Sequence, residues 1–232
     1  MSNFLKNKTC LFIGTPDCAY TKECINELYH HEMLPTIVYN SHRGEKIPKQ
    51  VLDWQGDLIL SYRNYWLMPS SLINNTKIAA LNFHPATPNF PGSGAYNWAL
   101  YEDVDKFGIT VHFMNEKIDN GKIIKIYEFP ITGKETLKSL ITITKKFSVS
   151  VFKDFLDLFN RTKSISEIHD MNENPENLKW IGRAKTIKDL DQMRKLDLNS
   201  SSQEFYKRIK SFHTDKFPVY IEKNGFVFKY SP

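Results

Sequence analysis

The chain has 232 residues, 41% of them hydrophobic and 25% charged, with a formal net charge of +5. This is ordinary globular composition. The positive charge is mild and spread along the chain, without the block of like charges typical of a nucleic-acid-binding tail. No apolar stretch approaches the length that spans a bilayer. We therefore expect neither a nucleic acid nor a membrane as a partner, although a mild positive charge also fits a phosphorylated or nucleotide-bearing ligand.

Cysteine usage points to a reducing compartment. The three cysteines, Cys10, Cys18 and Cys24, form no CxxC pair and are an odd number, which favours free thiols. The N-terminal sequence lacks the small-residue cleavage pattern of a signal peptide. We expect a soluble, cytoplasmic protein.

Short apolar runs alternate with helical segments in the first half of the chain. Strands are predicted at 8–14, 35–40, 57–61 and 77–84, with a helix over 16–31 and a helical turn at 70–73. Such alternation predicts an α/β fold: a Rossmann-like, mostly parallel sheet flanked by helices. The continuous apolar character of the strands indicates burial on both faces.

The second half contains two further strands, a long helix and a small tail. The strands are predicted at 108–115 and 122–131, joined by a turn containing Asp119 and Asn120-Gly121. An amphipathic helix follows over 134–160, and the polar stretch 161–177 is interpreted as a linker. The tail has a helix at 201–212 with serine as its N-cap and a hairpin at 217–230 around Asn224-Gly225. We expect a catalytic domain at 1–165 and a small C-terminal helix-plus-hairpin region at 166–232.

Several common cofactor and metal motifs are missing from the sequence. The glycine after the first strand is not part of GxGxxG, and there is no GxxxxGK[ST] loop, HExxH motif, metal-like histidine cluster or GxSxG elbow. We expect no bound metal. The polar residues that remain as candidates for chemistry are Asn82, His84 and Asp119.

Asn82 and His84 stand at the carboxyl end of the fourth predicted strand, where α/β sheets bind ligands. Residues two apart on a strand share one face, roughly 6–7 Å apart, and the proline- and glycine-rich loop 85–94 follows them. An amide, an imidazole and a carboxylate together suit acyl transfer, because they stabilise an oxyanion and move a proton. The alternative is structural: a turn asparagine, a satisfied buried histidine and an ordinary hairpin aspartate.

Segments 82–102 and 107–131 resemble the core motif of the folate-dependent formyltransferase family. That motif runs Asn-x-His-Pro, a Pro/Gly loop, an aromatic segment, Gly-[Ile/Val]-Thr-x-His, then Asp-x-Gly-x-Ile-[Ile/Val], and every element is present in order. The sequence LFIGTPDCAY (11–20) is similar to the family's first strand and turn. One departure is Ala86, where relatives often have glycine after His-Pro.

The resemblance implies an enzyme that uses 10-formyltetrahydrofolate as formyl donor and an amine as acceptor. By position, Asn82, His84 and Asp119 are then the catalytic residues. Asn82 and His84 would stabilise the tetrahedral oxyanion, and Asp119 would hold His84 and help to accept or relay the amine proton. His112 matches the family's Thr-x-His and is interpreted as a support on its strand.

The resemblance also implies binding residues, which we assign by their place in the motifs. The donor's pterin head would lie beside Leu67, Met68, Ile118 and Asp119. Candidate acceptor contacts, cationic or aromatic and polar, are Lys77, Tyr96, Asn97, Arg183 and Lys185. For the three cations the alternative is an ordinary surface position, and for the aromatic segment it is core packing.

Within the family, the loop and the tail look most like the sugar N-formyltransferases, and among these like dTDP-4-amino-4,6-dideoxyglucose N-formyltransferases. These act on nucleotide-linked amino-dideoxysugars for surface polysaccharides such as the O-antigen. The resemblance further implies a homodimer formed through the terminal hairpin. Two alternatives stay open: a glycinamide ribonucleotide formyltransferase, and a non-catalytic folate or nucleotide-sugar binding module on this fold.

Overall fold

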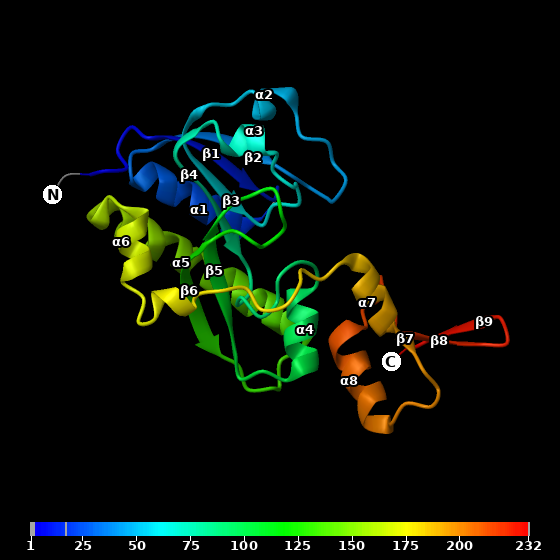
Figure 1. The fold of residues 1–232 in the computed structure, drawn as a ribbon. Coiled ribbons are helices and arrows are strands. Elements are labelled where there is room, and N and C mark those ends of the chain that lie inside the picture. The colour runs from blue at the N-terminus through cyan, green and yellow to red at the C-terminus, as the bar shows by residue number, and fades with distance from the viewer. Residues whose placement is uncertain (1–2, 17, 232) are drawn as a thin grey trace.

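A six-stranded sheet forms the centre of the computed structural model, which describes residues 3–16 and 18–231 (Figure 1). Four residues lie outside the described part: 1, 2, 17 and 232. Residues 1 and 2 begin the first predicted domain, residue 232 ends the second, and residue 17 falls in the first predicted helix. The strands are β1 (Thr9–Gly14), β2 (Leu34–Tyr39), β3 (Gly56–Tyr62), β4 (Thr76–His84), β5 (Lys106–Phe113) and β6 (Ile123–Pro130). Their order is β2-β1-β3-β4-β5-β6.

The sheet is mostly parallel, as predicted. The first four strands pair in parallel, whereas β5 runs antiparallel to β4 and β6 antiparallel to β5. The short β5–β6 connection joins these antiparallel strands as a hairpin, and Asp119 in its turn lies 3.3 Å from His84 at the carboxyl end of β4. The hairpin turn therefore lies next to the end of β4, where the candidate residues are.

Helices cover both faces of the sheet, as the apolar strands predicted. In β1, Cys10 and Phe12 belong to one buried cluster, whereas Leu11 and Ile13 belong to another. The first face packs against α1 (Ala19–His30), α5 (Leu137–Thr162) and α6 (Ile165–Asp170); the second lies under α2 (Lys49–Leu52) and α3 (Ser70–Ile73). Alternate side chains point to opposite faces of a strand, so β1, β3 and β4 each contribute to two cores. The expectation of burial is wrong for β2, which lies at the edge of the sheet and has no buried residue.

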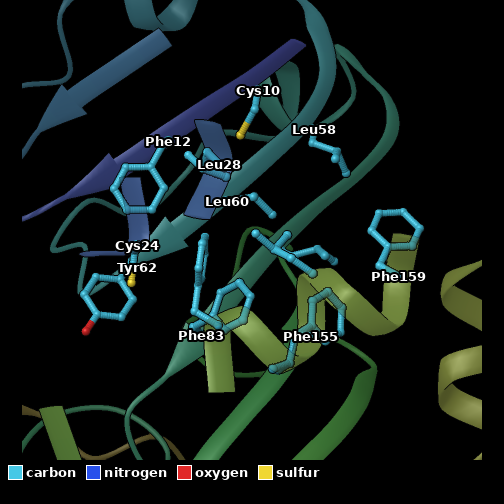
Figure 2. Packing of buried hydrophobic residues seen from close by; sticks show 14 of the residues in the cluster. Cys10, Phe12, Cys24, Leu28, Leu58, Leu60, Tyr62, Phe83, Phe155 and Phe159 are labelled. Carbon is cyan, nitrogen blue, oxygen red and sulfur yellow. The ribbon is translucent and has the colours of Figure 1, made fainter. Parts of the chain in front are cut away.

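The long helix α5 supplies aromatic side chains to the first core (Figure 2). It begins with a capping box in which the Thr136 hydroxyl accepts from the Ser139 amide. Phe152, Phe155 and Phe159 are buried along one stripe. The ring of Phe83 lies 4.9 Å from that of Phe152 and 5.5 Å from that of Phe155. This packing anchors β4 just before His84.

The C-terminal elements lie to one side of the main sheet, against α4 (Ala95–Glu102) (Figure 1). They are α7 (Ile187–Arg194), β7 (Lys195–Leu196), α8 (Ser202–Phe212), β8 (Tyr220–Lys223) and β9 (Phe226–Lys229), and the three strands form a second sheet. Trp98 of α4 packs edge-on against Phe212 of α8 at 5.1 Å. The predicted cap at Ser201 and the hairpin turn at Asn224-Gly225 are both confirmed.

Several short elements escaped prediction: α2, α4, α6, a 3₁₀ turn, α7 and β7. Helix α4 begins directly after Gly94, at φ +76, and is apolar on nearly all sides, so it shows no helical periodicity. The stretch 161–177 is not a plain linker, because α6 and a 3₁₀ turn (Pro175–Asn177) form there and Ile165 and Ile168 reach the main core. Helix α7 and the two-residue β7 were also missed.

The domain boundary at 165/166 stays a prediction. In the described part of the chain, no helix is both long and apolar enough to cross a membrane.

Candidate active site

Three polar side chains form a row across the carboxyl ends of β3, β4 and β5. Strand pairing places Ser61 beside Asn82 and Asn82 beside His112. The Ser61 hydroxyl donates to Asn82 Oδ1 at 2.8 Å, and Asn82 Nδ2 lies 3.0 Å from His112 Nε2. His112 Nδ1 lies 2.8 Å from the carbonyl of Phe113, to which it can only donate. His112 Nε2 is then the acceptor for the Asn82 amide in the neutral imidazole, and one amide hydrogen of Asn82 is left for a ligand.

Asp119 lies between His84 and His112. One carboxylate oxygen is 3.3 Å from His84 Nδ1, and the other is 3.6 Å from His112 Nε2. The backbone amide of Gly92 donates to the first oxygen at 2.7 Å. The chain therefore gathers Asn82, two imidazoles and one carboxylate in a single network.

Backbone conformation at two positions makes this network possible. Asp119 has φ +42, in the left-handed region that short polar side chains tolerate. Gly92 has φ +87, and a Cβ there would meet the backbone of Lys185. A side chain at position 92 would thus move the amide that binds Asp119, so glycine is required at this place.

Burial and charge set the ionisation of the pair. His84 is 5% exposed, and burial lowers its pKa although Asp119 acts to raise it. Burial acts to raise the pKa of Asp119, but His84, His112 and the Gly92 amide outweigh it and lower that pKa to about 2. Asp119 is therefore a carboxylate, and His84 a neutral imidazole, at neutral pH.

Both ring nitrogens of His84 face a hydrogen-bond acceptor, although the neutral ring has only one N–H to donate. Its Nδ1 faces Asp119, and its Nε2 lies 3.0 Å from the carbonyl of Phe90. A neutral imidazole carries a single N–H, so it donates to one of these acceptors and leaves the other contact without a proton. When the hydrogen is on Nε2, a turn of the ring redirects it from the Phe90 carbonyl towards a ligand oxygen.

A cavity of about 290 Å³ opens beside this network. Its wall includes the polar row, Asp119, the start of the proline-rich loop and three cationic side chains from separate segments, Arg43, Arg63 and Lys117. Arg63 follows β3 directly and has φ +58, a strained conformation for a long side chain.

The structure brings together seven of the residues singled out in the sequence. The cavity is lined by Asn82, His84, Asp119, Leu67, Met68, Ile118 and Tyr96. Leu67 and Ile118 are exposed at its rim, whereas Met68 is buried. Burial raises the pKa of Tyr96 to about 12, so its phenol keeps its proton.

The other four candidates lie outside the cavity. Lys77 is near the amino end of β4, at the opposite end of the strand from His84. Asn97 is buried and donates to the carbonyl of Ser211 in α8. Arg183 pairs with Asp189 in α7, and the Lys185 ammonium lies over the Trp98 ring at 4.8 Å. Their positive charge or polarity made them candidates in the sequence, but Asn97, Arg183 and Lys185 have structural partners and Lys77 lies away from the cavity.

The cavity residues that were missed or set aside include Ser61, His112, Arg43, Arg63 and Lys117. Ser61 and Arg63 end a parallel strand, as Asn82 and His84 do, so the strand-end rule could have indicated them. Arg43 comes from a loop that no local pattern ties to the site. Within residues 3–16 and 18–231, no group of three or more His, Cys, Asp or Glu side chains is arranged to hold a metal ion.

Comparison with protein families matches residues 19–156 to the formyl transferase model. The match covers more than half of the chain, including the whole polar network. The chain belongs to the formyl transferase family.

Individual relatives are distant. A methionyl-tRNA formyltransferase from Mycoplasmopsis pulmonis is 24% identical over 81% of this chain. This chain spans 62% of that relative's length, and about half the length of other curated relatives of the same name.

Solved structures share the fold over almost the whole chain. A sugar N-formyltransferase from a Shewanella species superimposes with a TM-score of 0.71 at 18% identity, covering 96% of both chains. An N-formyltransferase from Helicobacter canadensis, in complex with folinic acid and dTDP-3-aminofucose, gives a TM-score of 0.65 at 16% identity over 94% of this chain and 85% of its own.

Proposed function

We propose that this protein transfers a formyl group from 10-formyltetrahydrofolate to the amino group of a nucleotide-linked amino-dideoxysugar. The observation that carries the proposal is the network of Asn82, His84, His112 and Asp119 on the wall of one cavity, in a chain of the formyl transferase family. Acyl transfer to an amine requires hydrogen-bond donors for the oxyanion and a group that moves a proton. The Asn82 amide, the imidazoles and the Asp119 carboxylate supply these groups on the same wall.

The residues divide the chemistry between them. As the new bond to nitrogen forms, negative charge develops on the formyl oxygen, and the free amide hydrogen of Asn82 is placed to stabilise it. In the tautomer that carries its hydrogen on Nε2, His84 adds a second hydrogen bond by turning that hydrogen from the Phe90 carbonyl to the formyl oxygen. The Asp119 carboxylate, beside Nδ1, favours positive charge on the attacking amine. With a pKa of about 2, this carboxylate relays a proton towards the leaving nitrogen and does not retain it.

One side of the cavity suits the donor. The folate supplies the activated formyl group, and its flat, partly apolar head needs apolar walls with a few polar groups. Leu67, Met68 and Ile118 provide such walls next to Asp119. Leu67 is 55% exposed and Ile118 51% exposed, so both have apolar surface to bury against a ligand.

The cations of the cavity suit an anionic acceptor. Arg43, Arg63 and Lys117 line it with Asp119 as the acidic member of the wall, and Asp119 is already in contact with both imidazoles and the Gly92 amide. Guanidinium groups bind phosphate through paired hydrogen bonds. The diphosphate of a nucleotide sugar is the proposed partner of Arg43 and Arg63, in place of Lys77, Arg183 and Lys185.

The proposal extends to a narrower identity. We take dTDP-4-amino-4,6-dideoxyglucose as the first acceptor to test, with a role in the biosynthesis of a surface polysaccharide such as O-antigen in the cytoplasm. Residues 1–165 would form the catalytic domain and 166–232 a region for assembly. The shared fold with the Shewanella and Helicobacter enzymes supports this branch.

The test is an acceptor screen with purified protein. Release of tetrahydrofolate from 10-formyltetrahydrofolate is followed by absorbance, and formylated products by mass spectrometry, with dTDP-linked 4-amino and 3-amino sugars, glycinamide ribonucleotide and methionyl-tRNA as separate arms. We expect turnover with a nucleotide sugar, and His84→Asn to lower it by about 100-fold or more with an unchanged circular dichroism spectrum. Turnover with glycinamide ribonucleotide or methionyl-tRNA alone, or ligand binding without turnover in every arm, would refute the proposal.

A further inference from the structure

Residues 180–185, called the strap here, cross the site from outside the cavity. After α6 the chain runs over the main domain towards α7 (Figure 1), and on the way the strap contacts both loops that build the polar network. Trp180 is absent from the cavity wall, so its contacts with the network are made from behind.

Trp180 covers the two imidazoles of the network. Its ring lies edge-on to His84 at 5.6 Å and to His112 at 4.9 Å. Its Nε1–H donates to the carbonyl of Gly121 at 2.8 Å, in the turn that carries Asp119. One side chain therefore fixes the position of the Asp119 turn relative to both histidines, and it keeps water off the rear of the imidazole–carboxylate pair.

The rest of the strap holds the opposite loop. The amide of Ile181 donates to the carbonyl of Pro88 at 3.0 Å, and that of Lys185 to the carbonyl of Pro91 at 2.9 Å. In return, the amide of Ser93 donates to the carbonyl of Lys185 at 2.8 Å. The stretch fixed in this way, 88–93, supplies the Phe90 carbonyl that faces His84 and the Gly92 amide that binds Asp119.

From these contacts we infer that Trp180 is a positioning residue for formyl transfer, holding His84, His112 and Asp119 in working geometry without touching either substrate. The inference rests on the proposed function for its kinetic part. Reacting groups misplaced by about 1 Å lose roughly 100-fold in rate, so a residue that fixes three of them has a large effect on kcat. Because Trp180 does not line the cavity, its removal leaves substrate affinity almost unchanged.

Two substitutions separate the roles of the indole. Trp180→Phe keeps an aromatic ring against the histidines but cannot donate to Gly121, and the loss of one hydrogen bond should lower kcat about fivefold. Trp180→Ala removes the cover as well, and kcat should fall roughly 100-fold. In both variants the KM for donor and acceptor should stay within about twofold of the native value, the pattern of an interaction that acts on the transition state.

Two variants act as controls. Trp54→Phe makes the same change at a tryptophan beside Gly56, near the amino end of β3 and away from the cavity. Ile181→Ala changes the next residue of the strap, whose side chain is 54% exposed, and leaves its backbone hydrogen bond in place. Both should keep native kcat and KM.

A second readout needs no activity. Diethyl pyrocarbonate modifies accessible histidines, and peptide mass spectrometry locates each modification. His84 and His112 are 5% and 3% exposed, and His31, which is also 5% exposed, lies near Asp157 of α5 and away from the strap. In Trp180→Ala, His84 and His112 should react about tenfold faster, with His31 as protected as in the native protein.

The outcomes are distinguishable. Native protection of His84 and His112 in Trp180→Ala, or equal loss of protection at His31, would overturn the inference, and so would a rise in KM without a fall in kcat. If the native protein transfers no formyl group to any acceptor, the proposed function fails, while the histidine reactivities still decide whether Trp180 holds the network.

Discussion

At the scale of single residues, the hydroxyl of Ser61 decides which way the Asn82 amide points. It donates to Asn82 Oδ1 and so turns the Nδ2 group towards His112 and the cavity. Without this donor the amide can rotate, and its oxygen would then face the developing oxyanion. Ser61→Ala should therefore lower kcat about fivefold, the effect of one hydrogen bond, with little change in KM.

Ser211→Ala is the matched control for that prediction. Ser211 is another buried serine, on α8, and its hydroxyl has no hydrogen-bond partner within the described residues. Steady-state kinetics with both substrates should give native values for Ser211→Ala. Equal kcat for Ser61→Ala and the native protein would show that the Asn82 amide is oriented by other contacts.

Asp119 should make the stability of the protein depend on pH in the acid range. Its pKa falls from 3.8 to about 2 on folding, so the folded state favours the carboxylate. The contribution, about 2 kcal/mol, is fully present above pH 4 and is lost as pH falls towards 2. Asp119→Asn should therefore lower the free energy of unfolding at pH 7, and by only about half as much at pH 3.

Urea unfolding of both proteins at pH 7, 5 and 3 measures this dependence. The pH 5 difference should equal that at pH 7, because both lie above the unfolded pKa of 3.8. A difference that stays constant down to pH 3 would mean that Asp119 is not held as a carboxylate by His84, His112 and the Gly92 amide.

At the scale of elements, the loop 85–94 depends on the backbone of Gly92. An alanine there would have φ near +87 and place its Cβ against the backbone of Lys185. The Gly92 amide would then move away from Asp119. Gly92→Ala should cost about 1–3 kcal/mol in stability and lower kcat by more than tenfold.

Gly182→Ala separates strain from displacement in that experiment. Gly182 also has a positive φ, +72, but a Cβ there meets nothing within 4 Å. Its replacement should cost only the backbone strain, about 1 kcal/mol, and leave kcat near the native value. Thermal unfolding and steady-state kinetics of the two variants provide the comparison, and equal losses of kcat would contradict a role for the Gly92 amide.

Elements with a local signal were predictable from the sequence, and those fixed by distant contacts were not. The strands of the main sheet, the long helix and the terminal hairpin each carry an apolar pattern or a turn dipeptide. The pair Asn82 and His84 followed from strand alternation. Helix α4 is apolar on nearly all sides because it is sandwiched between α5 and α8. Its environment, and not its own periodicity, determines its composition.

The rest of the site depends on contacts between residues far apart in the chain. Ser61 and His112 join Asn82 only through strand pairing across β3, β4 and β5. Trp180 reaches the histidines from beyond α6, a separation that no local rule spans. The cations singled out for their charge, Lys77, Arg183 and Lys185, show the converse: charge indicates a type of ligand, but only the fold decides which cations face the cavity.

At the scale of the whole molecule, the terminal hairpin exposes an apolar patch of the kind that marks an interaction surface. In β9, Phe226 is 69% exposed and Val227 and Phe228 are each 55% exposed. Strand β9 is also the edge of its sheet, with unpaired backbone groups. We expect a homodimer in which two hairpins cover each other. Phe226→Ser with Phe228→Ser should convert it to a monomer in sedimentation velocity.

Tyr29→Ser with Tyr39→Ser is the control, because it removes a similar amount of exposed aromatic surface from α1 and β2. That variant should stay dimeric. The polar network lies in the main domain, so the hairpin variant should keep at least roughly half of the native kcat at saturating substrate. A native protein that sediments as a monomer at micromolar concentration would contradict the dimer. A monomeric hairpin variant that loses all turnover would instead show that the second copy completes the site.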